Sequence, residues 1–339
     1  MGNFIGDEME NPFTPRNPIK DAQMFFGREK IFDGILKDIY RKQMQSQCII
    51  GERRIGKTSL LYQIMNESVG KEYRDKPDSF SFIKTDMNFF PGSSPEDILK
   101  EWATTIAKTS EYHKSVGSGY LHFKRFIEEI NGSGYKIAIL LDEFEATIKN
   151  PHLNRDFFEY LRALTQHYDV AFILFSRTPL QYFLQNEKYS SIFSSPFFNT
   201  LNVSYLSFLE EEDARKLIIE PSAKAGIDLA DHVDFILEKA YYHPFLIQVI
   251  CEILVNEKGK SEIHCDRIMK EFEIQTEEFF SYLWMHSEPD EKEGLITLVQ
   301  NRDIEKRTRR KLERRSLLKE KEMKIFCPSF EKFISEQIH

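Results

Sequence analysis

The sequence predicts an α/β fold in which a parallel five-stranded sheet is followed by a largely helical region. Three observations predict it. Continuous apolar runs at 136–141 and 170–175 are typical of strands that are buried on both faces of a parallel sheet. Segments with helical spacing alternate with strand-like runs up to about residue 205, which is typical of a doubly wound domain. Beyond that point strand-like runs largely stop and helical spacing dominates.

The individual elements follow from apolar spacing and from the residues that begin helices. Strands are expected near 46–50, 80–85, 136–141, 170–175 and 200–206. Helices fit 31–40, 95–110, 120–130 and 152–167, and after the sheet 210–225, 230–241, 244–256, 263–284, 289–299 and 302–316. The helix at 95 has the clearest start, because Ser94 is a capping residue and Pro95, Glu96 and Asp97 suit a first turn. A short β-wing at 324–327 is expected before a last helix.

Composition excludes several classes of protein. A chain of 339 residues with 41% hydrophobic residues is long and apolar enough for two or three packed domains. The 29 phenylalanines are spread along the chain, which indicates core filling and not a base-stacking surface. A net charge of −8 argues against a protein that coats nucleic acid as a whole. No run approaches the roughly 20 apolar residues of a membrane helix, so no membrane partner is expected.

The four cysteines indicate a reducing compartment. They stand at positions 48, 251, 265 and 327, with no C-x-x-C pair and no metal-finger spacing to histidines. The amino-terminal residues also lack the layout of a signal peptide. We therefore expect a reduced, cytoplasmic protein.

Residues 51–58 read Gly-Glu-Arg-Arg-Ile-Gly-Lys-Thr and fit the phosphate-binding P-loop pattern G-x-x-x-x-G-K-[ST]. An apolar run precedes the octet and helical spacing follows it, so strand, loop and helix come in the order that this chemistry needs. Gly51 and Gly56 let the backbone curl so that N–H groups point inward at an anion. Lys57 is expected to reach the β- and γ-phosphates, and the Thr58 hydroxyl to bind Mg²⁺. The expected nucleotide contacts in this segment are Gly51, Arg53, Arg54, Ile55, Gly56, Lys57, Thr58 and Ser59.

Charged residues follow two of the predicted buried strands. Asp142 and Glu143 stand at the carboxyl end of the run at 136–141, the edge of an α/β sheet where ligands bind. Asp142 is the candidate Mg²⁺ ligand beside Thr58, and Glu143 the candidate general base that polarises the attacking water. Glu145, on the next step of the turn, is held in reserve. The alternative is that the acidic pair only caps a helix and is solvated.

Arg177 stands at the tip of the strand expected at 170–175, which this topology places between the P-loop strand and the Asp-Glu strand. We expect Arg177 to face the γ-phosphate and to act with Lys57 and Glu143 as the catalytic residues. An ordinary surface ion pair is the alternative for Arg177. Arg155 and Arg162 lie on a helix suited to a trans-acting arginine, and the sequence favours neither.

Two segments after the sheet have further candidates. Pro244 opens a helix and is expected to press on the adenine or ribose of the nucleotide, although proline is also common at ordinary helix starts. Residues 306–315 are strongly basic and precede the predicted wing, so this helix could enter a DNA groove. A solvated helix face, or a patch for an acidic partner, would have the same basic sequence pattern. The candidate DNA contacts are Arg307, Arg309, Arg310, Arg314 and Arg315.

Taken together, these residues resemble the STAND and archaeal-type AAA+ P-loop ATPases over most of the chain. The resemblance covers 11–13 and 26–29, the P-loop, 141–143, 176–177, 220–221, 243–248 and 272–339. It implies that Phe26, Gly27 and Arg28 belong to an adenine-side motif and that Ser176-Arg177 is a sensor. It also implies an arm at 1–24, a P-loop nucleotide-binding domain at 25–206, an α-helical lid at 207–271 and a winged-helix-like domain at 272–339. Phe175 and Tyr242 depart from the family's usual Thr and Gly.

The resemblance implies an ATPase with ATP or ADP and Mg²⁺ as cofactors. It favours slow hydrolysis and a nucleotide-dependent molecular switch that assembles with itself or with a partner protein, in defence or regulatory signalling. The alternative is a DNA-binding AAA+ ATPase, such as an initiator, loader or transposition regulator, that uses the basic winged helix. A third hypothesis is a non-catalytic adaptor that holds nucleotide as a structural cofactor. A small-molecule kinase fits poorly, because such a kinase has no use for a lid followed by a winged helix.

Overall fold

The computed structural model of this chain describes residues 11–66, 79–110, 112, 116–184, 187–257, 265–319 and 322–338. The first ten residues of the expected N-terminal arm, and the first two residues of the helix expected at 263–284, lie outside these ranges. The chain forms two compact units. The sheet unit comprises Arg28–Glu52 and Lys57–Leu206. The helical unit comprises the described parts of Met1–Gly27 and Ser207–His339, together with Arg53–Gly56.

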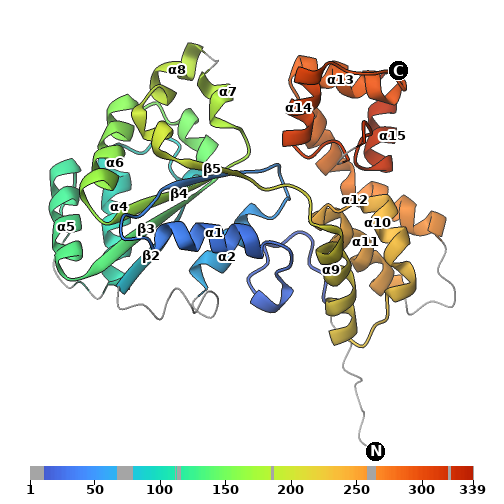
Figure 1. Ribbon diagram of the computed structural model, residues 1–339, viewed down its shortest axis with the longest axis horizontal. Helices are drawn as coiled ribbons and strands as arrows, with labels where there is room; N and C mark the ends of the chain where they lie inside the picture. Colours follow the sequence, from blue (N-terminus) through green and yellow to red (C-terminus); the bar gives the residue numbers. More distant parts are fainter. Residues whose placement is uncertain are drawn as a thin grey trace, which may run out of the picture. The chain divides into compact units, whose positions relative to one another are not determined.

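The sheet unit contains a five-stranded parallel sheet in the order β2-β3-β4-β1-β5. Four of these strands, β2 to β5, are labelled in Figure 1. Its strands are β1 (Gln47–Ile50), β2 (Ser79–Asp86), β3 (Tyr135–Asp142), β4 (Val170–Ser176) and β5 (Asn202–Tyr205). The predicted parallel five-stranded sheet is therefore confirmed. β4 pairs with both β1 and β3, with Ile50 opposite Ser176 and Leu141 opposite Leu174. This register brings the carboxyl ends of the three strands to one edge of the sheet.

The central strands form because their residues are apolar on both faces. Every residue of β4 is buried, as are Ile137 to Asp142 of β3. Ile137, Ile139 and Leu141 belong to one hydrophobic core together with residues of the flanking helices, while Ala138 and Leu140 point to the opposite face and are also buried. Burial on both faces explains why these strands read as continuous apolar runs. The helices of this unit are α1 (Glu29–Ile39), α2 (Lys57–Met65), α4 (Pro95–Thr109), α5 (Tyr120–Gly132), α6 (Arg155–His167), α7 (Leu180–Leu184) and α8 (Glu187–Phe193).

Aromatic side chains fill the core of the sheet unit. Trp102 of α4 is almost fully buried, and its ring centroid lies 5.9–6.3 Å from those of Phe123, Phe157 and Phe172. These four rings come from α4, α5, α6 and β4, so they tie three helices to the sheet. The many phenylalanines are used here for packing, in agreement with the sequence.

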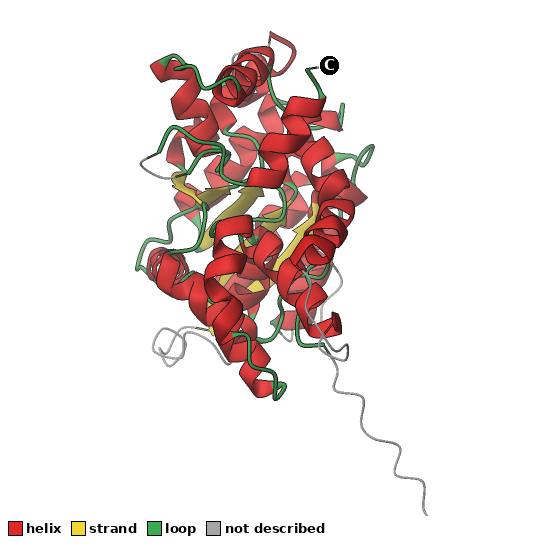
Figure 2. Cartoon of the chain, turned by 90° about the vertical axis from the view of Figure 1, so that its right-hand side faces the viewer, coloured by secondary structure: helices red, strands yellow, loops and turns green. Residues whose placement is uncertain are grey.

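The helical unit contains α9 (Glu211–Lys224), α10 (Val233–Ala240), α11 (Pro244–Glu257), α12 (Cys265–Met285), α13 (Pro289–Val299), α14 (Lys306–Arg314) and α15 (Pro328–Glu336). α11 is its central element, because apolar residues cover most of its circumference and are buried. Phe13 of the N-terminal arm is 1% exposed and belongs to the same core. The Asn11 amide donates to the carbonyl of Glu252 at 3.0 Å, which fixes the arm to α11. Helices dominate the chain as a whole (Figure 2).

The end of the helical unit has features that suit a winged helix. α13 and α14 approach closely at Gly294, where a Cβ would lie 2.5 Å from Cγ2 of Thr308. After α14 an antiparallel bridge joins Leu318 to Ile325, which lies within the expected β-wing at 324–327, and α15 follows. A winged-helix domain at 272–339 stays a prediction. Within the described ranges, none of the helices has the length and hydropathy of a membrane-spanning segment.

Candidate nucleotide site

The P-loop follows β1 directly and leads into α2. Gly51 donates its N–H to the carbonyl of Ser176 at 3.0 Å, so the start of the loop is anchored to the end of β4. Gly56 has φ +106°, a backbone angle that side chains rarely tolerate. A Cβ at Gly56 would meet nothing within 4 Å, so the glycine is needed for its backbone angle and not for space. α2 begins at Lys57, and its first N–H groups favour an anion at this point.

The Lys57 ammonium is buried within the loop. It is 6% exposed and donates to the carbonyls of Gly51 at 2.8 Å and Glu52 at 3.1 Å. Burial lowers the pKa of Lys57, and the charges of Glu145, Glu143, Glu52 and Asp142 act in the opposite direction. A buried cation that is bound mainly by neutral carbonyls gains from an added anion. Lys57 therefore suits the binding of phosphate.

Thr58 and Asp142 offer oxygen ligands for a divalent cation. The Thr58 hydroxyl donates to Oδ2 of Asp142 at 3.1 Å, and Nζ of Lys84 lies 3.9 Å from the same oxygen. Burial raises the pKa of Asp142, although Lys84 and the Thr58 hydrogen bond oppose the rise. One hydroxyl and one carboxylate fit Mg²⁺, which usually takes one or two carboxylates and completes its shell with water and phosphate oxygens. The described residues hold no cluster of three or more His, Cys, Asp or Glu side chains suited to a metal.

Glu143 and Arg177 meet at the ends of β3 and β4. Glu143 has φ +49° and ψ +46°, a left-handed turn that ends the strand sharply. Its Oε2 lies 3.6 Å from Nε of Arg177. Burial and the charge of Glu145 raise the pKa of Glu143, against the pull of Lys57 and Arg177. A carboxyl group with a raised pKa next to a buried lysine is suited to general-base work.

Glu145, which the sequence left in reserve, lies in the same cluster. Its Oε1 accepts a hydrogen bond from Nε of Arg177, and its Oε2 accepts from the Arg177 N–H at 3.3 Å. Burial acts to raise the pKa of Glu145, but Arg177, a backbone hydrogen bond and the charge of Lys57 together outweigh it, so the pKa lies below its usual range. Lys84 is the other neighbour that the sequence did not single out. The signal for Glu145 was a third acid close after Asp142 and Glu143, placed between the apolar residues Phe144 and Ala146.

Several predicted contacts lie in the helical unit. Arg54 donates to the carbonyl of Arg16 at 2.8 Å, and its guanidinium lies 5.3 Å from the Phe245 ring centroid. The Arg53 guanidinium lies 4.4 Å from the ring centroid of Tyr282. Burial, with the charges of Arg53 and Arg16, lowers the pKa of Arg54. Both arginines thus contact aromatic rings within this unit, and their contact with nucleotide stays a prediction.

The expected adenine-side residues have clear local roles. Gly27 has φ +71°, and a Cβ there would lie 2.7 Å from Cβ of Asp213, so the chain can pass α9 only with glycine at this position. Phe26 packs against the core of the helical unit, and Pro244 begins α11. In the sheet unit Arg28 is buried at the start of α1 and Ser59 is half-buried in α2, while Ile55 is buried in the helical unit. Binding of nucleotide by these residues stays a prediction.

The basic helix α14 and Arg315, which follows it, contain cations with ion-pair partners and cations whose side chains are exposed. Arg315 donates to Glu291 at 2.7 Å and to Ser287 at 3.0 Å, and its side chain is 12% exposed. Lys311 pairs with Asp290, and Arg309 pairs with Glu313. Lys306, Arg307, Arg310 and Arg314 are exposed. Arg315 thus holds α13 and α14 together, which leaves the exposed arginines as the better candidates for DNA.

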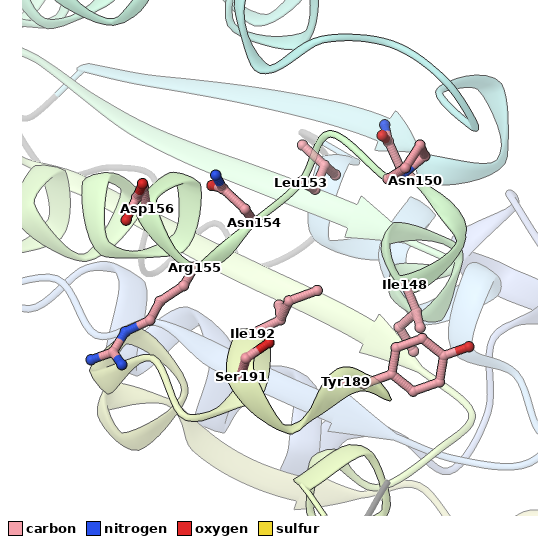
Figure 3. A pocket seen from close by; sticks show the side chains of 10 residues that line it. Ile148, Asn150, Leu153, Asn154, Arg155, Asp156, Tyr189, Ser191 and Ile192 are labelled. Atoms are coloured by element: carbon pink, nitrogen blue, oxygen red, sulfur yellow. The ribbon is translucent and has the colours of Figure 1, made fainter. Parts of the chain in front are cut away.

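A cavity of about 400 Å³ lies elsewhere in the sheet unit (Figure 3). Its lining comes from the segment after β3, the start of α6, and α8, and includes Ile148, Asn150, Arg155, Asp156 and Tyr189. Arg155 pairs with Glu159 at 2.7 Å, and the Asn150 amide donates to the carbonyls of Phe90 and Ser93. This mixed lining does not concentrate positive charge, so the P-loop cluster is the better phosphate site.

A parallel sheet in the order 2-3-4-1-5, with a P-loop after β1 and an acidic pair after β3, defines a P-loop nucleoside triphosphatase. The sequence matches the family described as "Novel STAND NTPase 2" over residues 42–303. The chain belongs to this family, so it is an NTPase of the STAND class. The predicted kinship with STAND NTPases is confirmed.

Solved structures share the fold at low sequence identity. The Walker-type ATPase of Pyrococcus abyssi superposes with a TM-score of 0.62 at 13% identity, covering 94% of this chain and 99% of that one. The ORC2 protein of Aeropyrum pernix, solved as ADPNP-ADP complexes, gives a TM-score of 0.59 at 14% identity, covering 94% and 89%. At such identities the likeness establishes the fold alone. No curated protein matches this chain in sequence.

Proposed function

We propose that this chain binds ATP with Mg²⁺, hydrolyses it slowly, and acts as a nucleotide-dependent switch that assembles with itself or with a partner protein in regulatory or defence signalling. The observation that carries the proposal is the cluster at the ends of β1, β3 and β4. There a buried lysine, a hydroxyl–carboxylate pair and a glutamate–arginine pair are gathered, and the charges of Glu143 and Asp142 act on the lysine. These are the groups that phosphoryl transfer uses, because it depends on positioning and on charge neutralisation.

Each residue of the cluster has a role in this proposal. Lys57 and the first N–H groups of α2 bind the phosphates. Thr58 and Asp142 would hold Mg²⁺, which when bound neutralises charge on the β- and γ-phosphates. Glu143 orients a water molecule and takes its proton. Arg177 contacts the γ-phosphate, so its position differs between ATP and ADP.

The rest of the chain supplies the response to nucleotide. We propose an arm at 1–24, a nucleotide-binding domain at 25–206, a helical lid at 207–271 and a winged-helix domain at 272–339. The STAND family match and the likeness in fold to a protein solved with ADPNP and ADP support the use of ATP and ADP. The chain's cysteine content supports a cytoplasmic setting.

The test is the mass of the full chain by light scattering, with and without ATP and Mg²⁺. The wild type is compared with Lys57→Ala and Glu143→Gln. An increase in mass that persists in Glu143→Gln and vanishes in Lys57→Ala supports a switch that assembles with itself. A constant monomer mass in every state rules out self-assembly and favours an adaptor that acts on another chain.

A second candidate function is DNA binding by a AAA+ ATPase. It rests on the exposed cations of α14 and on a cavity of about 350 Å³ lined by Lys306, Arg309, Arg310 and Met323. Repeating the mass measurement with duplex DNA separates the two functions. An ATP-dependent increase in mass that requires DNA would place this function first.

A further inference from the structure

Glu145 is the most buried carboxylate that contacts Arg177. Its side chain is 10% exposed, against 32% for Glu143. Taking a carboxylate out of water costs several kcal/mol unless a cation and hydrogen bonds compensate it. Glu145 meets that condition mainly through Arg177, because both of its carboxylate oxygens accept hydrogen bonds from that residue.

The two contacts fix Arg177 at both ends of its side chain. One oxygen of Glu145 binds the backbone N–H at the tip of β4, and the other binds Nε of the guanidinium. A side chain that is held at its backbone and at its charged end has few conformations left. The Arg177 guanidinium is therefore set in place before any nucleotide binds.

The same guanidinium nitrogen also faces Glu143. Nε of Arg177 lies 3.6 Å from Oε2 of Glu143, beyond a good hydrogen bond but within the range of an ion pair. If Glu145 lost its charge, Glu143 would still lie within ion-pair range of Arg177. A close Arg177–Glu143 pair would then occupy the carboxylate that has to orient water.

We infer that Glu145 is a positioning residue that holds the Arg177 guanidinium and keeps it from closing onto Glu143. This inference rests on the proposed function, because it assigns water activation to Glu143. It gives Arg177 two states, one bound to Glu145 and one shared with the phosphate, with Glu143 left to act on water in both. Glu145 itself touches neither nucleotide nor water in this arrangement.

The first test separates turnover from binding. In Glu145→Gln we expect kcat for ATP to fall at least about 10-fold, because the catalytic Arg177 is displaced. The Kd for ATP should stay within about 2-fold of the wild-type value. Because Glu145 acts through Arg177, Glu145→Gln combined with Arg177→Gln should be no slower than Arg177→Gln alone. Glu128→Gln is the matched control, since Glu128 is an exposed acid of the same unit that pairs with Lys124. Independent, multiplying losses in the double variant would overturn the inference.

The second test needs no turnover. The coupling between Glu143 and Arg177 is measured from urea unfolding of the nucleotide-free full chain, using single and double glutamine variants. Trp284→Phe is the common background, because it leaves buried Trp102 as the one tryptophan and hence the reporter of the sheet unit. Coupling here is the factor by which the unfolding constant of the double variant departs from the product of the two single effects. We expect this factor to be about 2 with Glu145 present and about 10 in the Glu145→Gln background. Equal coupling in the two backgrounds would overturn the inference.

The two tests also distinguish the inference from the proposed function. If the wild type shows no turnover with any nucleoside triphosphate, the proposed ATPase fails while the coupling measurement still decides the role of Glu145. If Glu145→Gln does not fold, Glu145→Asp replaces it, because the shorter side chain keeps the charge but cannot reach both contacts. The coupling between Glu143 and Arg177 should then lie between the values for Glu145 and for Glu145→Gln. A coupling equal to that measured with Glu145 present would count against the inference.

Discussion

The sheet unit and the helical unit distribute their charged residues differently. In the sheet unit Lys57, Asp142 and Glu145 are all buried and lie together at the ends of parallel strands. In the helical unit several ion pairs join neighbouring turns of one exposed helix, such as Arg215 with Glu211, and others join different helices. Parallel strands gather residues from distant parts of the sequence at one edge, whereas helices spread theirs along the surface. A buried cluster of charges is therefore the stronger sign of function.

The largest effect should come from Lys57→Ala. Removing this buried ammonium leaves the phosphates without their main cation, so we expect the Kd for ATP to rise about 1,000-fold, the scale of a lost buried charge pair. Fluorescence titration with a labelled ATP analogue measures it. Lys124→Ala is the control, because Lys124 is an exposed lysine of the same unit that pairs with Glu128. Retained affinity in Lys57→Ala would place the nucleotide site elsewhere.

Glu143→Gln should affect turnover and leave binding intact. An amide keeps the size of the side chain and one acceptor oxygen but cannot take a proton from water. We expect kcat to fall about 100-fold, the scale of a lost general base, with the Kd for ATP within about 2-fold of wild type. Single-turnover phosphate release measures it. An equal loss of affinity would mean that Glu143 binds nucleotide instead of activating water.

The sheet unit was the easier one to predict from the sequence. Strands buried on both faces are continuous apolar runs, and the residue that follows each run falls at the sheet edge, which located Asp142 and Arg177. Glu145 was assigned no role because its direction depends on the left-handed turn at Glu143, and the sequence around Glu143 gives no sign of that turn. α7 and α8, of 5 and 7 residues, were missed because so few residues show no clear helical period.

The helical unit shows where sequence patterns stop being informative. Arg310 and Arg315 stand in one basic run and look alike in sequence. Only the packing of α13 against α14 makes Arg315 a partner of buried Glu291 and leaves Arg310 exposed. The difference between the two arginines arises from tertiary packing, so a local sequence pattern cannot predict it.

A third prediction concerns that buried pair. Glu291→Gln removes the charge that Arg315 faces, and Glu291 is only 2% exposed in its side chain. We expect the free energy of unfolding of the helical unit to fall by about 2 kcal/mol, the scale of a buried charged hydrogen bond. Urea unfolding followed by Trp284 fluorescence, in a Trp102→Phe background, measures it. Glu313→Gln is the control, since Glu313 pairs with Arg309 on the exposed face, and unchanged stability in Glu291→Gln would show that the pair is not structural.

The exposed cations of α14 test the second function. In Arg307→Glu combined with Arg310→Glu, we expect affinity for duplex DNA to fall about 10-fold at moderate salt, with a shallower dependence on salt, because two phosphate contacts are lost. Fluorescence anisotropy at several salt concentrations measures both. Arg215→Glu with Lys216→Glu is the control, because it reverses the same charge on α9. Equal losses in the two variants would indicate a general charge effect and remove the case for α14.

The smallest effect concerns the tip of the P-loop. Its residues Arg53–Gly56 belong to the helical unit, whereas the residues on either side belong to the sheet unit. Arg53 is a P-loop residue by sequence, yet its guanidinium lies over Tyr282 of α12, whose ring also stacks on His286 at 3.9 Å. We expect Arg53→Ala and Tyr282→Leu to be coupled by about 0.5–1 kcal/mol in unfolding free energy, the scale of an exposed cation–π contact. Urea unfolding of the four members of this cycle, followed by Trp284 fluorescence, measures it. Additive losses would mean that Arg53 does not rest on the aromatic ring, and the nucleotide contact expected from the sequence would then be the better assignment for this side chain.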